Sequence, residues 1–267
     1  MASFNFDESQ LLAEIYAQAL EDEGIAVRRE LDLGPRELVL PALRQGFVDV
    51  VPEYLGTLLD AATSSPPGVR GDPVIVHALL GPVLAPWGLE VLAWSPASNQ
   101  NAVVVTREAA EDGSLVAVSD LAATAPELTL GGPAECPARE RCLVGLQQSY
   151  SLRFRDFLAL NGSRLVRQAL LDGVIDVGVL FSTDGYLAGD DLVALADDRG
   201  LQPAENVVPV VRSAAVAGTR VGPVLDEVSA ALTTSDLQFL NWRVALAGGS
   251  PRDEARGWLI RHGLIGR

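Results

Sequence analysis

A nine-residue pattern that occurs twice is the strongest constraint on the fold of this chain. Residues 42–50 and 169–177 carry Ala, Leu, Gly, Asp and Val at the same spacing, 127 positions apart. In each copy, apolar residues at helical spacing lead to a glycine suited to the left-handed position after a helix, and a short apolar strand follows. A chance recurrence of this common order is the alternative. As a true repeat, the pattern predicts two similar α/β lobes.

Each repeated strand is followed by a polar segment, at residues 52–57 and 182–186. Open α/β sheets bind ligands in loops beyond the carboxyl ends of their strands, so we predict two ligand-binding loops.

Trp242 and Trp258 are expected in the core or between lobes. Periodicity and turn residues predict helices over 8–23, 36–45, 74–84, 222–246 and 251–264, strands over 25–31, 89–94, 102–106 and 207–211, and a loop over 64–68.

Two polar joints divide the chain. Residues 95–101 and 201–206 are mostly small or polar, each segment contains a proline, and an apolar strand follows each. A strand, a polar joint and another strand is how a chain passes from one lobe to the next. The sequence therefore predicts a discontinuous first lobe, residues 1–97 with 205–267, and an inserted second lobe, residues 98–204.

Composition excludes several classes of protein. With 267 residues, 48% of them hydrophobic, the chain can bury substantial cores and is not intrinsically disordered. The net charge of −15 would repel the phosphate backbone of DNA or RNA. All basic residues are arginine, which excludes Schiff-base, P-loop and kinase-lysine chemistry. No apolar run approaches the roughly 20 residues of a membrane helix.

The two cysteines bear on the cellular compartment. Cys136 and Cys142 lie in a charged, proline-containing stretch that is typical of a loop. A pair this close can form a disulfide if the backbone turns back, and the alternatives are two thiols or half of a metal site. We expect the disulfide, and with it an oxidising compartment. The chain begins without the basic and apolar regions of a signal peptide, so it is either cytoplasmic or has lost its signal segment.

Several segments together resemble the substrate-binding proteins of ABC importers for quaternary ammonium osmolytes, of the glycine betaine, choline and carnitine type. The similarity runs in order from about residue 3 to about residue 247. The most specific matches are Pro-Glu-Tyr-Leu-Gly-Thr at 52–57 and Ser-Thr-Asp-Gly at 182–185. Further matches lie within 6–16, 46–49, 145–152, 173–176, 191–198 and 209–212.

The resemblance implies an α/β chain with the type II periplasmic-binding-protein fold. Each of its two lobes would be a mixed sheet flanked by helices, with a ligand cleft between the lobes. The implied function is an extracytoplasmic binding protein, periplasmic or a cell-surface lipoprotein, that delivers a small osmolyte to an ABC permease by interlobe closure. We expect a monomer without cofactor or metal.

The resemblance also implies site residues. A quaternary ammonium group donates no hydrogen bond, so aromatic faces and carboxylates recognise it. Tyr54 matches a tyrosine of the family's aromatic cage, Thr57 a hydroxyl that contacts a ligand carboxylate, and Arg139 an arginine clamp. Phe4 replaces a family lysine, and Glu205 a family tyrosine. The candidate ligand-binding residues are Asn5, Tyr54, Thr57, Ser98, Asn99, Asn101, Arg139, Thr183, Asp184, Glu205 and Asn206.

Most of these residues also have a structural interpretation. Tyr54 is also compatible with a partly buried core tyrosine, and Arg139 and Glu205 with exposed loop positions. Thr57 and Thr183 are suited to capping helices, and Asp184 to holding its turn. With 4 tyrosines in the chain a full tyrosine cage cannot be built, so a cationic or hydroxylated solute, with Glu205 as its counter-charge, is as reasonable as betaine.

Other functions are less compatible with the sequence. His77 and His262 fall in helical patterns, and no nucleophile elbow or dinucleotide-binding loop is present, so we expect no enzyme. Paired-carboxylate catalysis stays open, because acidic residues are plentiful. A sensory or permease-fused ligand-binding domain of the same fold, or one for another small polar or cationic solute, is the main alternative.

Overall fold

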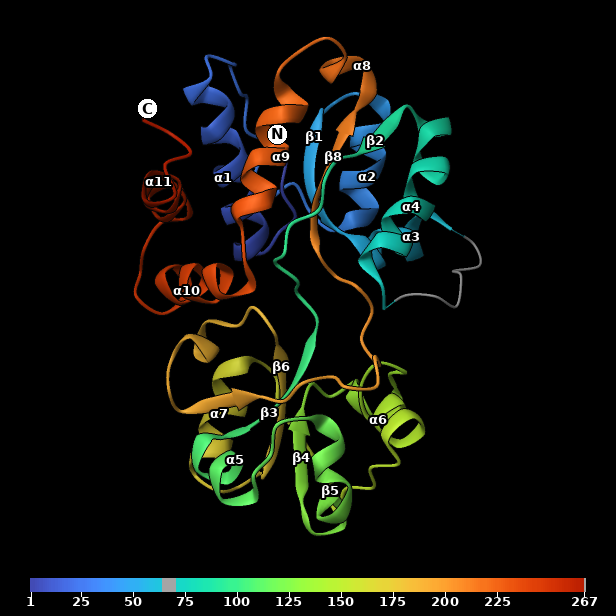
Figure 1. Cartoon of the computed structure of the whole chain (residues 1–267), viewed down its shortest axis with the longest axis vertical. Coiled ribbons are helices and arrows are strands. Elements are labelled where there is room, and N and C mark those ends of the chain that lie inside the picture. The colour runs from blue at the N-terminus through green and yellow to red at the C-terminus, as the bar shows by residue number, and fades with distance from the viewer. Residues whose placement is uncertain (64–70, 267) are drawn as a thin grey trace. The chain divides into compact units, whose positions relative to one another are not determined.

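The computed structural model describes residues 1–63 and 71–266, so the loop expected at 64–68 lies outside the described residues. These residues divide into two compact units (Figure 1). Unit 1 comprises residues 1–99 and 204–267, and unit 2 comprises residues 100–203. No helix in the described ranges is both long enough and apolar enough to cross a membrane.

Unit 1 contains a three-stranded sheet with β8 (Val207–Arg212) at its centre. Strands β1 (Val50–Tyr54) and β2 (Leu89–Val91) pair with opposite edges of β8, both antiparallel to it. Because successive side chains of a strand point to opposite faces, the sheet buries an apolar layer on each side. Val50 and Tyr54 join one core, and Val51 joins the other.

Helices cover both faces of this sheet (Figure 1). The four helices on the face of Val50 bury Trp258, the largest fully buried side chain of the described residues, at 1% exposure. They are α1 (Asp7–Asp22), α9 (Val221–Ala231), α10 (Thr234–Ala245) and α11 (Pro251–Arg261). The face of Val51 is covered by α2 (Arg36–Gln45), α3 (Leu55–Ala62) and α4 (Pro73–Leu84). Short segments η1 (Ala85–Trp87) and α8 (Ser213–Val216) flank β2 and β8.

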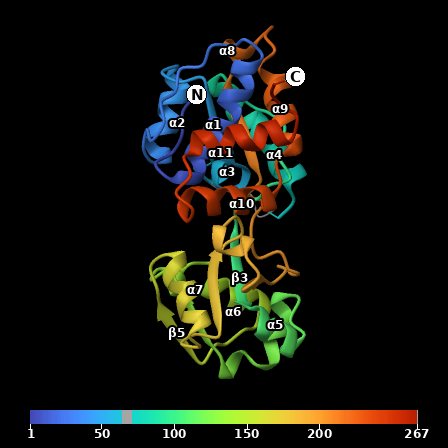
Figure 2. The ribbon, with the colours of Figure 1, turned by 90° about the vertical axis from the view of Figure 1, so that its left-hand side faces the viewer.

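Unit 2 contains a five-stranded mixed sheet in the order β5-β4-β6-β3-β7. The strands are β3 (Asn101–Thr106), β4 (Thr129–Gly132), β5 (Asp156–Ala159), β6 (Val177–Phe181) and β7 (Leu192–Ala194). Strand β4 is parallel to β5 and β6, whereas β3 is antiparallel to both of its neighbours. Helix α7 (Ser163–Leu171) packs on one face, and α5 (Arg107–Gly113) and α6 (Leu143–Tyr150) pack on the other (Figure 2). The 3-10 segments are η2 (Val118–Ala123), η3 (Ala125–Glu127), η4 (Cys136–Ala138) and η5 (Gly185–Ala188).

The repeated sequence has the same local structure in both units. Helix α2 ends at Gly46 (φ 79°) and leads to β1, and α7 leads through Gly173 (φ 66°) to β6. In each copy the amide after the glycine closes the helix on the carbonyl five residues earlier, at 3.0 Å for Phe47 and 2.9 Å for Val174. The prediction of helix, glycine and strand is confirmed for both copies.

The aspartate of the repeat ties each strand to its neighbour. Asp49 Oδ1 accepts from Arg212 Nε at 2.9 Å, at the end of β8. Asp176 Oδ2 accepts from the amide of Thr129 at 2.8 Å, where β4 begins. The two carboxylates therefore fasten equivalent positions with different partners.

Several expected elements differ in the structure. Residues 52–54 belong to β1, and α3 begins at once after them, so the predicted loop at 52–57 is wrong. Residues 25–31 form no strand beyond a single bridge between Ala2 and Glu30, because their apolar side chains pack against α1 without a neighbouring strand. The helix predicted over 222–246 is two helices, since Thr233 and Asp236 form a capping box that starts α10. Trp242 is 39% exposed, so it does not lie in the core of unit 1, and the Arg243 guanidinium lies over its ring.

Candidate functional site

A buried polar network gathers at the end of β1 in unit 1. The Tyr54 hydroxyl donates to Glu8 Oε1 at 2.6 Å, and Asn99 Nδ2 donates to the same oxygen at 2.8 Å. Asn241 Nδ2, on α10, donates to Glu8 Oε2 at 2.6 Å. Burial raises the pKa of the Tyr54 hydroxyl well above its usual range, and the Glu8 carboxylate adds to this shift. Tyr54 is therefore a proton donor that holds a buried carboxylate.

Glu205 extends this network to α3. Its carboxylate accepts from Thr57 Oγ1 at 2.7 Å and from the Thr57 amide at 3.1 Å. Its carbonyl accepts from the amide of Asn99 at 2.9 Å, which links it to the Glu8 contacts. Glu205 is buried, so the interpretation as an exposed joint residue is wrong. Thr57 lies inside α3 and does not cap it.

An ion pair between a buried glutamate and a partly buried arginine lies next to the network. Arg36 Nε and Nη2 each donate to Glu53 at 2.9 Å, a bidentate arrangement. Burial raises the pKa of Glu53 above its usual range, against the effect of Arg36. Burial also opposes the charge on Arg36, but Glu53 and the charge of Glu205 nearby hold its pKa above the usual value.

Aromatic rings continue from this ion pair to Tyr54. The Arg36 guanidinium lies over the Phe4 ring at 5.0 Å, Phe4 stacks on Phe6 at 5.9 Å, and Phe6 stacks on Tyr54 at 6.4 Å. Phe6 is 41% exposed, so one aromatic face next to the buried network reaches the surface of unit 1. Asn5, between the two phenylalanines, is also exposed.

Ser98 and Asn206 fasten the backbone around these residues. They form a single antiparallel bridge, and the Ser98 amide donates to Thr234 Oγ1 at 3.1 Å. Asn206 Nδ2 donates to the Ser95 carbonyl at 2.9 Å, and the Asn206 carbonyl accepts from the amide of Leu55. Six predicted residues of unit 1 thus lie together, namely Tyr54, Thr57, Ser98, Asn99, Glu205 and Asn206.

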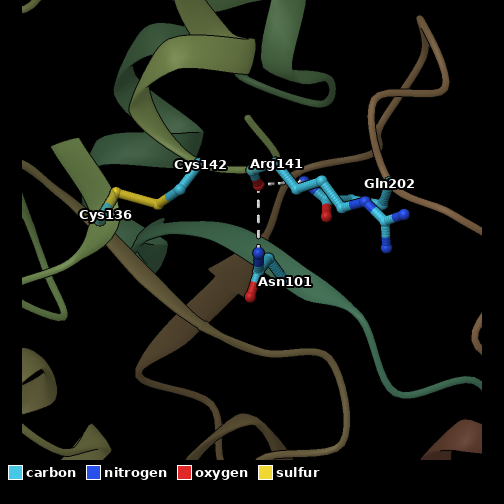
Figure 3. Close-up of a disulfide and its surroundings, with 5 residues drawn as sticks. All are labelled: Asn101, Cys136, Arg141, Cys142 and Gln202. Atoms are coloured by element: carbon cyan, nitrogen blue, oxygen red, sulfur yellow. Dashed lines mark hydrogen bonds between the residues drawn. A yellow bond between two sulfur atoms is a disulfide. The ribbon is translucent and has the colours of Figure 1, made fainter. Parts of the chain in front are cut away.

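In unit 2, the predicted Asn101 braces the disulfide loop (Figure 3). Cys136 and Cys142 form the expected disulfide. Asn101 Nδ2 donates to the carbonyl of Arg141 at 3.1 Å, and Gln202 Nε2 donates to the same carbonyl at 3.0 Å. Asn101 and Gln202 lie at the two ends of unit 2, where the chain enters and leaves it. One carbonyl beside the disulfide thus holds both segments.

The other predicted residues of unit 2 lie in different surroundings. Thr183 is buried, and Asp184 Oδ1 accepts from the amide of Tyr186 at 2.9 Å. Asp184 thus holds its turn and caps η5, and the capping role expected of Thr183 is wrong. Arg139 is exposed in the disulfide loop. Within residues 1–63 and 71–266, no group of three or more His, Cys, Asp or Glu side chains could hold a metal ion.

Sequence reasoning missed Glu8, Phe6 and Asn241. Glu8 is an acidic residue in the first turn of an amphipathic helix, a position that usually indicates only a favourable contact with the helix dipole. Its partner Asn241 is 233 residues away, and nothing in the local sequence of α10 marks that residue. The only available signal was the match at 6–9, which contains Phe6 and Glu8.

Comparison with solved structures gives the fold a reference. The chain superposes on a structure described as a glycine betaine/carnitine/choline ABC transporter with a TM-score of 0.91, at 24% identity, covering 99% of this chain and 98% of that one. It superposes on apo YehZ of Escherichia coli with a TM-score of 0.89, also at 24% identity, with the same coverage. The fold is that of the type II periplasmic binding proteins.

Sequence relatives agree with the motifs. YehZ of Escherichia coli, a glycine betaine-binding protein, is 26% identical over 96% of this chain and 88% of its own length. A glycine-betaine-binding protein of Pseudomonas aeruginosa is 27% identical over 97% of this chain and 86% of its own. The ergothioneine transport permease and binding protein EgtU of Helicobacter pylori is 24% identical over 96% of this chain, which spans only 46% of that protein.

The family assignment covers almost the whole chain. Residues 1–261 match the family OpuAC, described as the substrate-binding domain of the ABC-type glycine betaine transport system. The match includes both units and every candidate residue named above. This chain belongs to the OpuAC family of substrate-binding domains of ABC-type transport systems.

Proposed function

We propose that the chain binds a small quaternary ammonium solute outside the cytoplasm and delivers it to an ABC permease. The observation that carries this proposal is the network of Tyr54, Glu8 and Asn99 beside the half-exposed ring of Phe6. An aromatic face next to a carboxylate is the combination that attracts a cation unable to donate hydrogen bonds. The names of the relatives, glycine betaine-binding proteins, support the same class of ligand.

The two units are proposed to act as the two lobes of the family. On this proposal unit 1 contributes Asn5, Tyr54, Thr57, Ser98, Asn99, Glu205 and Asn206 to solute binding. Unit 2 contributes Asn101, Arg139, Thr183 and Asp184. The hydrogen bonds of Asn101 and Asp184 to their own unit make these two residues positioning groups rather than dedicated ligand contacts.

The disulfide supports a location outside the cytoplasm, because such bonds persist in oxidising compartments. We propose that the protein is a periplasmic or surface-anchored monomer. Its two histidines support binding rather than catalysis. His77 Nε2 contacts the Leu92 carbonyl at 2.8 Å, and His262 Nδ1 contacts the Trp258 carbonyl at 3.0 Å, so each ring is occupied by its own helix or the adjoining strand region.

The relation to EgtU favours a second arrangement. This chain spans 46% of EgtU, whose name combines a permease with a binding protein. A permease-fused form is therefore the alternative for the full-length gene product. Transmembrane helices in the unprocessed product would support fusion, and a signal peptide with a lipid-anchored cysteine would support a separate binding lipoprotein.

Calorimetry and thermal melting test the binding function. The panel consists of choline, glycine betaine, carnitine, proline betaine and ergothioneine, with polyols as uncharged comparisons. A solute that binds only the native state stabilises it by RT ln(1 + [L]/Kd), so the melting temperature rises as the solute concentration exceeds Kd. If no quaternary ammonium solute raises the melting temperature at millimolar concentration, the proposed function is wrong.

A pair of exposed phenylalanines provides a matched control. Phe6→Ala should weaken binding of any solute found, by roughly 3- to 30-fold, the value of one aromatic contact to a cation. Phe47→Ala removes another exposed phenylalanine ring of unit 1, at 68% exposure, in the turn that follows α2. Equal effects of the two variants would remove Phe6 from the site.

A further inference from the structure

Glu8 differs from the other three buried glutamates of unit 1, each of which interacts with an arginine. Glu205, at 5% exposure, accepts hydrogen bonds from Thr57 and raises the pKa of Arg36 through its charge. Glu14 and Glu53, at 3% and 2% exposure, each bind an arginine, Glu14 through Arg29 Nε at 2.8 Å and Glu53 through Arg36. Glu8 is similarly buried, at 6% exposure, but its three hydrogen-bond donors are all neutral: a phenol and two amides. Among the described residues, Glu8 is thus a buried carboxylate without a cationic side chain.

Burial of a charged carboxylate without a cationic partner is energetically unfavourable. An ionised carboxylate accepts hydrogen bonds and donates none, and all three contacts of Glu8 are donors that point at it. Hydrogen bonds to neutral groups offset only part of the cost of burying a charge. The N-terminus of α1 adds a partial positive charge, equivalent to roughly half an elementary charge. Within residues 1–63 and 71–266 no cationic side chain pairs with Glu8, and a bound cation would supply the counter-charge.

The surroundings of Glu8 suit a soft, alkylated cation. The Tyr54 hydroxyl contacts the carboxylate and the Phe6 ring stacks on the Tyr54 ring, with Phe6 two residues before Glu8 in the chain. A quaternary ammonium is attracted by aromatic faces and by a carboxylate at longer range, without needing a direct hydrogen bond. The hydrogen bonds that hold Glu8 fix the position of its charge relative to the rings.

Glu205 repels an anionic group of a ligand, whereas Glu8 attracts a cationic one. Both donors of Thr57, the hydroxyl and the amide, are directed at the Glu205 carboxylate. A ligand carboxylate that approached Thr57 would have to displace Glu205 and meet its negative charge at short range. Arg36 interacts electrostatically with Glu205, but its Nε and Nη2 atoms already donate hydrogen bonds to Glu53. Thr57 is therefore already occupied by a carboxylate of the protein itself.

We infer that the ligand of this site is a quaternary ammonium cation without a carboxylate, of the choline type, with Glu8 as its counter-charge and with the Glu205–Thr57 contact excluding zwitterionic betaines. This inference rests on the proposed function and specifies its ligand. It also replaces Glu205 by Glu8 as the group that attracts the cation.

Calorimetric titration of three probes tests the inference. The probes are choline, glycine betaine and 3,3-dimethyl-1-butanol, which has the shape of choline without its charge. The wild-type protein should bind choline at least 10-fold more tightly than either of the others. Glu8→Gln should weaken choline by at least 10-fold and leave the uncharged alcohol within about 3-fold, because only choline carries a charge that the carboxylate attracts. The variant also replaces one acceptor oxygen by an amide NH2, and this change is the same for both probes. Glu205→Gln should bring glycine betaine closer to choline in affinity.

Asp7→Asn is the matched control for Glu8→Gln. It removes one negative charge from the same first turn of α1, at an exposed side chain, and should change choline affinity less than 3-fold. If Glu8→Gln fails to fold, as judged by circular dichroism, the wild-type comparison of choline with the uncharged alcohol still decides. Equal binding of these two probes overturns the inference.

The outcomes separate the two proposals. If glycine betaine binds as tightly as choline or more tightly, the proposed function stands and the inference is wrong. If Glu8→Gln folds and leaves choline affinity within about 2-fold, the inference is likewise wrong. If none of the quaternary ammonium solutes binds, the proposed function itself fails.

Discussion

The ion pair of Arg36 with Glu53 holds a fully buried carboxylate in unit 1. Glu53 lies on β1 with 2% exposure, and Arg36 is the first residue of α2. A pair in this position need not be more stabilising than apolar residues, but removal of one partner leaves the other as an isolated buried charge. Loss of either residue should therefore lower the stability of the fold more than loss of a residue from an exposed ion pair, such as that of Arg28 with Glu30.

Arg36→Ala should lower the free energy of unfolding by about 3–5 kcal/mol, since it leaves Glu53 buried and uncompensated. Arg28→Ala, which breaks a pair whose arginine side chain is 79% exposed, should cost less than about 1 kcal/mol. Urea unfolding monitored by circular dichroism measures both changes. Similar small losses in the two variants would show that Glu53 is solvated and the argument from burial is wrong.

The same variant has a predicted pH dependence. Burial already raises the pKa of Glu53 above its usual value of 4.5, and loss of Arg36 should raise it further. A raised carboxyl pKa means that the folded state favours the protonated form, so stability is greatest below the unfolded pKa and is lost as pH rises through the folded pKa. The deficit of Arg36→Ala should therefore shrink as the pH falls from 7 towards 4.5. A deficit that stays constant over this range would contradict the assignment to Glu53.

At the residue scale, the sequence predicted candidate site residues but not their hydrogen-bond partners. The match at 52–57 indicated Tyr54 and Thr57, and the polar joints indicated Asn99 and Glu205. The structure joins these four through hydrogen bonds. That Thr57 is taken up by Glu205, and Tyr54 by Glu8, could not be predicted, because the partners are 148 and 46 residues apart in sequence.

At the scale of elements, the repeat was predictable because its signals are local. A glycine at φ 79° or 66° ends the helix in a conformation that residues with a Cβ rarely adopt, and the apolar strand follows in the same register. The segment 25–31 shows the converse. Its apolar pattern suits a strand, but whether a strand forms depends on a pairing partner, which is not encoded within the segment.

The two repeat glycines make the equivalence of the units testable. Gly46→Ala and Gly173→Ala should each cost about 1–2 kcal/mol, the strain of a left-handed conformation. A Cβ at Gly173 would meet no atom within 4 Å, and at Gly46 only ordinary contacts with Arg212 from 3.5 Å, so crowding adds little. Chemical unfolding of the two variants should give similar losses. A large loss at one position alone would show that the copies are not equivalent.

The disulfide loop is a second element with a separable contribution. It closes a ring of six sequence positions, which the loop-entropy relation values at about 2 kcal/mol. The double variant Cys136→Ser/Cys142→Ser should lose about this amount in the free energy of unfolding. Addition of a reductant to the wild type should have the same effect and should not change the variant further.

Two side-chain amides that donate to the Arg141 carbonyl should add to the stability of the disulfide loop. Asn101→Ala and Gln202→Ala each remove one donor to the carbonyl beside Cys142 and should each cost about 1 kcal/mol. Because the two donors share one acceptor, the double variant should deviate from the sum of the single losses. Strict additivity would show that the carbonyl is satisfied equally well by water.

At the scale of the whole molecule, composition excluded several classes of protein, and the family match assigns the chain to one family. The charge of −15 argued against nucleic acid, and residues 1–261 match a family of transport substrate-binding domains. The type II fold was predictable from the repeat and the motifs together. The ligand that we infer could not be predicted, because the inference depends on the partners of the buried carboxylates, which come from both segments of unit 1.

The buried tyrosines predict how the molecule responds to alkali. The hydroxyl of Tyr16 contacts Ser229 Oγ at 2.9 Å, that of Tyr54 donates to Glu8, and that of Tyr150 donates to Asp197. Burial raises the pKa of all three phenols above the usual value of 10, and the Glu8 and Asp197 carboxylates add to the shift for Tyr54 and Tyr150. The folded state thus retains protons that the unfolded chain releases above pH 10.

A raised pKa of this kind contributes stability that is fully present below pH 10 and is lost as the pH rises further. For three such groups the free energy of unfolding should fall by up to about 4 kcal/mol per pH unit. Tyr16→Phe should reduce this slope by about one third, besides its loss of one hydrogen bond. Urea unfolding between pH 9 and 11 measures the slope, and phenolate absorbance should rise together with the loss of circular dichroism. Ionisation of these three phenols in a protein that keeps its native circular dichroism would contradict their assignment as buried hydrogen-bond donors.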